Sequence, residues 1–309
     1  MTAPLVPAQA GGAASLVPAS PGAGSADRPA TARVADRRVP NAKVAARAAG
    51  VAAVLLFWWG VTGVLLALQR SAGTRLLALG LAIAAAGGGL ALTARVRRVA
   101  GPEPGGSAGA AAAAVLAGAL LWTCVSAAFY GGWIVGPALG GVPAPHAVTL
   151  AHAARAVAAT AYSSALALAL LAAAWHLAGG REATGRGPAV FAPLTFAVLW
   201  GAHELAKLNV FLGVANPGAE LLPVYLAPLR AYFGPERNSP LLGVSVAGLA
   251  AVAAGMAFGA SRRTAGPGRR TGLALVAGVL ALAALEHALL GVHDPVGWWD
   301  AFLRWRGAP

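Results

Sequence analysis

The chain has 309 residues, of which 58% are hydrophobic and only 11% are charged, with a formal net charge of +13. An ordinary soluble domain has about a quarter of its residues charged, so this composition excludes a water-soluble globular domain. The basic residues lie between apolar blocks rather than on one face with interleaved aromatic rings, which argues against nucleic-acid binding. Cys124 is the only cysteine, which excludes a disulfide framework or a cysteine-based metal site within the chain.

The first part of the chain, residues 1–46, is rich in Ala, Pro, Gly and Ser and contains several arginines. It lacks the apolar side chains that a core requires. The first long apolar run begins only near Gly50, too late for a signal peptide. We predict a disordered, basic, cytoplasmic tail over 1–46 and a membrane-embedded helical domain over 47–309.

Seven apolar blocks follow the tail, each close to the roughly 20 residues that an α-helix needs to cross ~30 Å of hydrocarbon. They lie at about 50–69, 75–94, 110–134, 151–178, 189–213, 241–260 and 272–292. The sequence therefore predicts an all-α fold, a polytopic transmembrane helical bundle of about seven spans.

The distribution of basic residues predicts how these spans are oriented. Fifteen Arg and Lys residues lie in the tail and in the loops after the second, fourth and sixth spans, whereas six lie on the opposite side. Because cytoplasmic loops carry the excess of Arg and Lys, we expect the N-terminus to be cytoplasmic and the C-terminus periplasmic.

The fifth span carries the most informative polar residues: His203, Glu204, Lys207 and Asn209 lie in a stretch that should be apolar. On a helix, Glu204 and Lys207 are three residues apart and His203 and Lys207 four apart, so these side chains share one face. A charge at mid-bilayer costs about 2.5–3.5 kcal/mol. Two readings stay open: a structural ion pair that locks the span to its neighbours, or a partner-docking or ligand-binding site.

A second polar group lies at the predicted periplasmic side. Glu286 and His287 end the seventh span. Other residues expected at this side are His293, Asp294, His152 and Arg155. A neutral imidazole can ligate a metal or the magnesium of a chlorin, with a hydrogen bond fixing its other nitrogen, and Glu204 or Glu286 could accept that bond. The six histidines show no HExxH or other ligand spacing, so no metal site is predicted.

The predicted periplasmic loop at 215–240 is rich in proline and aromatic residues. It is expected to form a turn followed by a short interfacial helix, which either covers the membrane surface or serves as a docking platform. The loop's docking candidates are Asn216, Glu220, Pro223, Tyr225 and Tyr232.

Enzyme and transporter signatures are missing from the sequence. There is no Gly-rich phosphate loop and no Gly-x-Ser-x-Gly elbow, and the spans do not divide into repeated halves. We expect no catalytic residues. A transporter or membrane enzyme would need a small substrate whose flux or turnover depends on Glu204 and Lys207.

The run AKLNVFLGVANPGAELLPVYLAPLRAYF, residues 206–233, resembles the signature segment of the photosynthetic complex assembly protein 2 family. Further similar stretches are FWWGVTGVLLAL at 57–68, AFYGGWIVGP at 128–137 and ALEHALLGVHDPVGWW at 284–299. The chain departs from the family in its long N-terminal tail and in Ala215, where the family's more usual residue is Pro.

The resemblance implies a multi-pass protein of the inner membrane, cytoplasmic or intracytoplasmic, of a purple-type phototrophic bacterium. It also implies that the gene for this protein lies with the genes for the reaction centre's H subunit and for other assembly factors. The role that the resemblance implies is assembly or pigment supply. Our first hypothesis is a non-enzymatic assembly factor that contacts reaction-centre or antenna subunits, other assembly factors and membrane lipid. The alternative is a pigment-delivery protein that binds bacteriochlorophyll through His203 or His287.

Overall fold

The computed structural model describes residues 60–61, 63–65, 67–69, 71–100, 106–137, 149–180 and 187–293. Secondary structure in these ranges is helical, with no strand among them. The tail predicted over 1–46 and most of the first predicted span, 50–69, lie outside the described residues. Within that span, Leu65 is buried and packs against Ala82 and Cys124.

Six helices in the described part of the chain are long and apolar enough to cross a membrane. They are α2 (Ala72–Ala100), α3 (Ala108–Tyr130), α5 (Ala161–Ala178), α6 (Phe191–Leu212) with the 3-10 turn η2 (Pro188–Val190) before it, α7 (Pro240–Ser261) and α8 (Pro267–Leu290). These are the features of a multi-pass membrane protein.

Local signals explain where several helices begin and end. The Ser107 hydroxyl accepts a hydrogen bond from the Ala110 amide at the start of α3, and such an N-cap satisfies an amide that has no partner in the helix. Prolines open α7 and α8, where the missing N–H costs nothing. Gly179 ends α5 in the left-handed conformation, φ 113°, which favours glycine.

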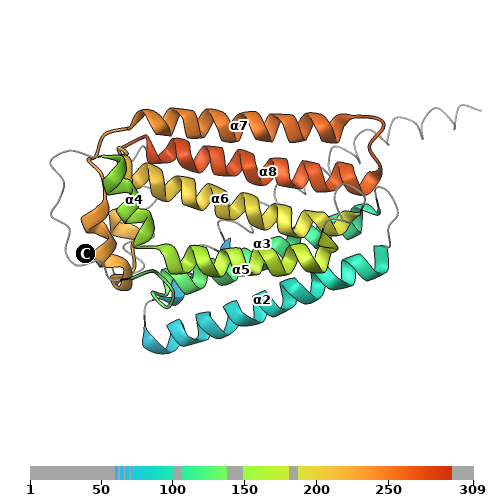
Figure 1. The fold of residues 1–309 in the computed structure, drawn as a ribbon, viewed down its shortest axis with the longest axis horizontal. Coiled ribbons are helices and arrows are strands. Elements are labelled where there is room, and N and C mark those ends of the chain that lie inside the picture. The colour runs from blue at the N-terminus through green and yellow to red at the C-terminus, as the bar shows by residue number, and fades with distance from the viewer. Residues whose placement is uncertain are drawn as a thin grey trace, which may run out of the picture. The chain divides into compact units, whose positions relative to one another are not determined.

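The helices α7, α8, α6 and α5 lie side by side, and α3 is central, in contact with α2, α5, α6 and α8 (Figure 1). Gly118 allows the close approach of α3 and α6, because a Cβ there would overlap the carbonyl of Ala192. The α6 and α8 helices end together, since the Asn216 amide donates to the Leu290 carbonyl.

The fourth predicted span, 151–178, is wrong in its extent. The structure has a nine-residue helix α4 (Leu150–Ala158) and then the longer α5, with a break at Ala159 and Thr160. The cause is the segment after α3: the Val135 carbonyl accepts hydrogen bonds from the Tyr162 and Ser163 amides. These amides would otherwise bond within a continuous helix, so the ladder is interrupted there.

The predicted turn and short interfacial helix in the 215–240 loop take the form of two 3-10 helices, η3 (Ala219–Leu221) and η4 (Val224–Tyr232). Pro228 lies inside η4, and proline removes an amide donor from a helix. The η4 segment packs against α4 and buries Leu226 and Leu229 in a cluster with Phe129 and Phe211.

Candidate functional site

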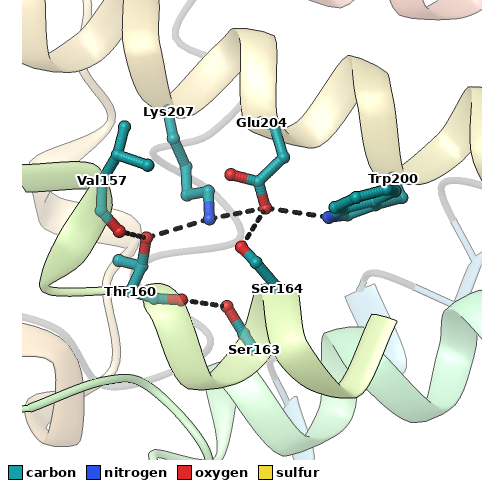
Figure 2. Close-up of polar contacts among 7 residues, drawn as sticks. All are labelled: Val157, Thr160, Ser163, Ser164, Trp200, Glu204 and Lys207. Atoms are coloured by element: carbon teal, nitrogen blue, oxygen red, sulfur yellow. Dashed lines mark hydrogen bonds and ion pairs between the residues drawn. The ribbon is translucent and has the colours of Figure 1, made fainter. Parts of the chain in front are cut away.

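The contact that the spacing of Glu204 and Lys207 permits is present in the structure. The Lys207 Nζ atom lies 2.8 Å from Glu204 Oε1, with 7% of the lysine side chain and 24% of the glutamate side chain exposed. Two more groups donate to the same oxygen, Ser164 Oγ at 2.9 Å and Trp200 Nε1 at 3.0 Å. The α5 and α6 helices are thus joined by one carboxylate oxygen with three donors (Figure 2).

The break between α4 and α5 supplies the second partner of the lysine. Lys207 Nζ donates to Thr160 Oγ1 at 3.0 Å, and that hydroxyl donates to the Val157 carbonyl at 3.0 Å. The Thr160 carbonyl accepts in turn from Ser163 Oγ at 2.7 Å. We call these seven residues the α5–α6 polar network: Val157, Thr160, Ser163, Ser164, Trp200, Glu204 and Lys207 (Figure 2).

His203 has different neighbours. Its ring packs edge-on against α3 aromatic residues, with centroids 5.2 Å from Trp122 and 5.3 Å from Phe129. Lys207 Nζ lies 5.7 Å from the centroid of the same Phe129 ring. The imidazole therefore lies beside the ion pair but packs as an aromatic group. Among the described residues, no hydrogen bond joins His203 to Glu204 or Lys207.

Asn209 lies on another side of α6. Its Nδ2 donates to the Leu205 carbonyl at 2.9 Å and to Ser245 Oγ of α7 at 2.9 Å. The residue is 0% exposed, and its Oδ1 accepts no hydrogen bond from the described residues. Asn209 thus joins α6 to α7 and is not part of the α5–α6 polar network.

His287 is enclosed within α8, with 2% of its surface exposed. Its Nδ1 lies 2.7 Å from the Ala283 carbonyl, and since a carbonyl only accepts, Nδ1 carries the proton. The buried Nε2 therefore presents a lone pair, which has no partner among the described residues. Glu286, half-buried, lies within electrostatic reach of Tyr130.

The sequence also placed His152, His293 and Asp294 at the side of Glu286 and His287, but the described residues do not form one polar cluster there. His152 is buried and its Nε2 donates to the Tyr232 carbonyl at 2.9 Å, while His293 is exposed. Asp294 lies outside the described residues. Within the described ranges, no three His, Cys, Asp or Glu side chains come together as a metal site.

A family model matches residues 45–304. This chain belongs to the family described as "Protein of unknown function (DUF3623)". The match covers the six apolar helices and the α5–α6 polar network. No curated protein and no solved structure matches the chain.

All the loop candidates in this DUF3623 chain except Glu220 are buried or contact other parts of the structure. The Arg75 guanidinium lies over two rings, 3.7 Å from the centroid of Tyr225 and 4.0 Å from that of Trp133, which are cation–π distances. The Asn216 side chain accepts from the Gly218 amide at 3.2 Å. Pro223 and Tyr232 are buried, whereas Glu220 is exposed.

Sequence reasoning named only Glu204 and Lys207 of the seven network members in the DUF3623 chain. It missed the three residues whose side chains bond this pair directly, Thr160, Ser164 and Trp200. Trp200 precedes Glu204 by four residues, so helical spacing could have indicated it. Thr160 and Ser164 are also four residues apart in an apolar stretch. Nothing local in the sequence relates that pair to Lys207, which is 47 residues beyond Thr160.

Proposed function

We propose that this DUF3623 protein is a non-enzymatic membrane assembly factor for the photosynthetic reaction-centre or antenna complex of a phototrophic bacterium. Its partners are subunits of that complex and other assembly factors. The proposal draws on the resemblance of residues 206–233 to the assembly family and on the six apolar helices. The finer parts of the proposal are seven spans, a cytoplasmic N-terminus and residence in the bacterial inner membrane.

The observation that carries the proposal is the unequal enclosure of the ion pair in α6. Lys207 is sealed, with 7% of its side chain exposed, whereas 24% of the Glu204 side chain is exposed. A pair that served only to lock two helices would gain most from complete enclosure, because charge facing hydrocarbon is costly. The open side of Glu204 favours a group that a second membrane protein covers.

The arrangement of the network supports binding rather than catalysis. Glu204 Oε1 is already held by Lys207, Ser164 and Trp200, so this oxygen is committed as an acceptor. The contacts drawn in Figure 2 hold the carboxylate in place through this one oxygen. Such a rigid carboxylate is suited to recognition of a partner.

A second candidate function, delivery of bacteriochlorophyll, is favoured by His287 alone. A neutral imidazole with Nδ1 held by a carbonyl and a lone pair on Nε2 is the donor arrangement that magnesium of a chlorin accepts. The ligand atom fits, but the surroundings do not, because Nε2 is buried and His287 is 2% exposed. Helix α8 would have to separate from its neighbours to admit a macrocycle, so this function is second.

The experiment is mild solubilisation and affinity purification from a phototrophic host, with an absorption spectrum and identification of co-purifying subunits. We expect colourless protein accompanied by reaction-centre or antenna polypeptides. Stoichiometric chlorin absorbance that is lost in His287→Leu and kept in His203→Leu would replace this proposal with pigment delivery. Colourless protein without any such polypeptide would contradict both.

A further inference from the structure

The two oxygens of the Glu204 carboxylate have different surroundings. Oε1 accepts from Lys207, Ser164 and Trp200, whereas Oε2 accepts no hydrogen bond from the described residues (Figure 2). A buried side-chain oxygen without a partner would belong to a small set of atoms that does not include Oε2. Oε2 is therefore accessible at the surface. Within the part of the chain that the structure describes, Glu204 therefore presents one acceptor without a donor at the surface of α6.

The helix surface one turn before this acceptor carries no side chain. Gly201 lies one turn before Glu204 on α6 and is exposed, and a Cβ built on Gly201 would meet no atom within 4 Å. Residues three apart on a helix lie on one face. Small residues let a second helix approach closely within a membrane, so Gly201 gives access to the outer side of Glu204.

The charge of the site indicates which kind of donor fits it. Glu204 and Lys207 already form a neutral pair at 2.8 Å. Adding a cationic side chain would leave a net positive charge in hydrocarbon, which costs several kcal/mol. A neutral hydroxyl or indole N–H satisfies Oε2 without that cost, as Ser164 and Trp200 already do for Oε1.

We propose that a transmembrane helix of a reaction-centre or antenna subunit packs over Gly201 and donates a neutral hydrogen bond to Glu204 Oε2. This inference rests on the proposed function and names the contact through which it acts. The donor is a Ser, Thr, Tyr or Trp side chain of the partner. Lipid and a second copy of this chain are the competing occupants of the surface.

The first test identifies the occupant with a photo-crosslinking amino acid at position 201 of the full chain, in membranes of the phototrophic host. Gly248 of α7 is the matched control position, because it too is exposed and has no atom within 4 Å of a built Cβ. We expect crosslinks from 201, and not from 248, to a reaction-centre or antenna polypeptide. Crosslinks from 201 to lipid alone, or to a second copy, would overturn the inference.

The second test measures how much of that polypeptide co-purifies with Gly201→Leu, Gly248→Leu and Glu204→Gln. Gly201→Leu blocks the approach and keeps both charges of the network. Glu204→Gln replaces Oε2 with an N–H₂ donor but also removes the counter-charge of Lys207, so its co-purification is compared only at equal recovery of monodisperse protein. One hydrogen bond between membrane helices corresponds to about a three- to twentyfold change. We expect a loss of that size or larger for both variants and none for Gly248→Leu.

The two proposals fail in different ways. If Gly201→Leu retains the wild-type amount of partner while deletion of the gene still lowers complex yield, the contact proposed here is wrong and the assembly function stands. If no complex subunit co-purifies with the wild-type chain and deletion changes nothing, the assembly function itself is wrong. Because Gly201→Leu leaves Glu204 and Lys207 in place, a folded, monodisperse variant is expected, and this is checked by size-exclusion chromatography.

Discussion

Helix α6 presents two polar sides that differ in charge and in closure. Toward α5 it places Glu204 and Lys207, a charged pair that is partly open. Toward α7 it places Asn209, a neutral group that is 0% exposed and bonded to Ser245. Polar side chains on either side of the helix cost free energy when they are placed in a membrane. The open, charged side is suited to a partner, and the closed, neutral side is suited to packing.

The difference between the two sides also lies in how many donors surround each acceptor. Three described donors meet at Glu204 Oε1, whereas Asn209 Oδ1 has no described donor. Hydrogen bonds to a charged group are roughly twice as strong as neutral ones. Removing one polar group on the α5 side should therefore cost more stability than removing one on the α7 side.

The largest expected effect is that of Lys207→Met, which leaves the Glu204 carboxylate without its counter-charge. Breaking one partner of a buried ion pair costs about 3–5 kcal/mol, so we expect a loss of unfolding free energy in that range. The measurement is reversible unfolding by SDS in mixed micelles, followed by tryptophan fluorescence.

A double variant separates the charge from the loss of packing. Lys207→Met with Glu204→Gln removes both charges, and it should recover most of the lost stability, because a neutral pair of similar shape carries no unpaired charge. A double variant as unstable as the single one would show that the ion pair is not the source of the effect.

A smaller effect is expected for Ser164→Ala, which removes one of the three donors to Glu204 Oε1. A hydrogen bond to a charged group contributes about 1.5–3 kcal/mol, and the two remaining donors keep the loss near the lower end. The same unfolding measurement applies, with Ser163→Ala as control, since Ser163 binds a backbone carbonyl and not the carboxylate. If Ser164→Ala and Ser163→Ala lose the same unfolding free energy, the hydrogen bond to the carboxylate is no stronger than the bond to the backbone carbonyl, and this prediction is wrong.

The smallest effect is expected on the neutral side of α6. Asn209→Leu removes the bond to Ser245, and bonds between membrane helices average about 0.6 kcal/mol. Ser245 Oγ keeps its bond to the Leu241 carbonyl, so no donor is left unpaired. Co-purification of complex subunits should stay at the wild-type level, and a loss equal to that of Glu204→Gln would contradict the division of α6 into two sides.

The sequence predicted what depends on local geometry. Apolar blocks indicated the helices, and a spacing of three residues placed Glu204 and Lys207 on one helix face, where they can meet. The same geometry could have separated Asn209, because five residues along an α-helix turn it by about 140° from Glu204. His203 was expected beside the pair, but its contacts with Trp122 and Phe129 depend on how α3 packs.

What the sequence could not indicate depends on distant segments. The break that brings Thr160 to Lys207 requires the Val135 carbonyl to bind amides of α5, and no spacing within the fourth predicted span records that contact. The Arg75 contact with Tyr225 likewise joins the start of α2 to η4. These contacts exist only once the helices have packed.

The most direct test of the proposed function is deletion of this gene from a phototrophic bacterium that carries it, with separate quantification of assembled reaction-centre and antenna complexes and of total bacteriochlorophyll. An assembly factor predicts a lower complex yield while synthesis of free pigment continues, and restoration by the wild-type gene but not by Glu204→Gln. An unchanged complex yield would contradict the assembly function, and restoration by Glu204→Gln as complete as by the wild type would contradict the role of Glu204 in it.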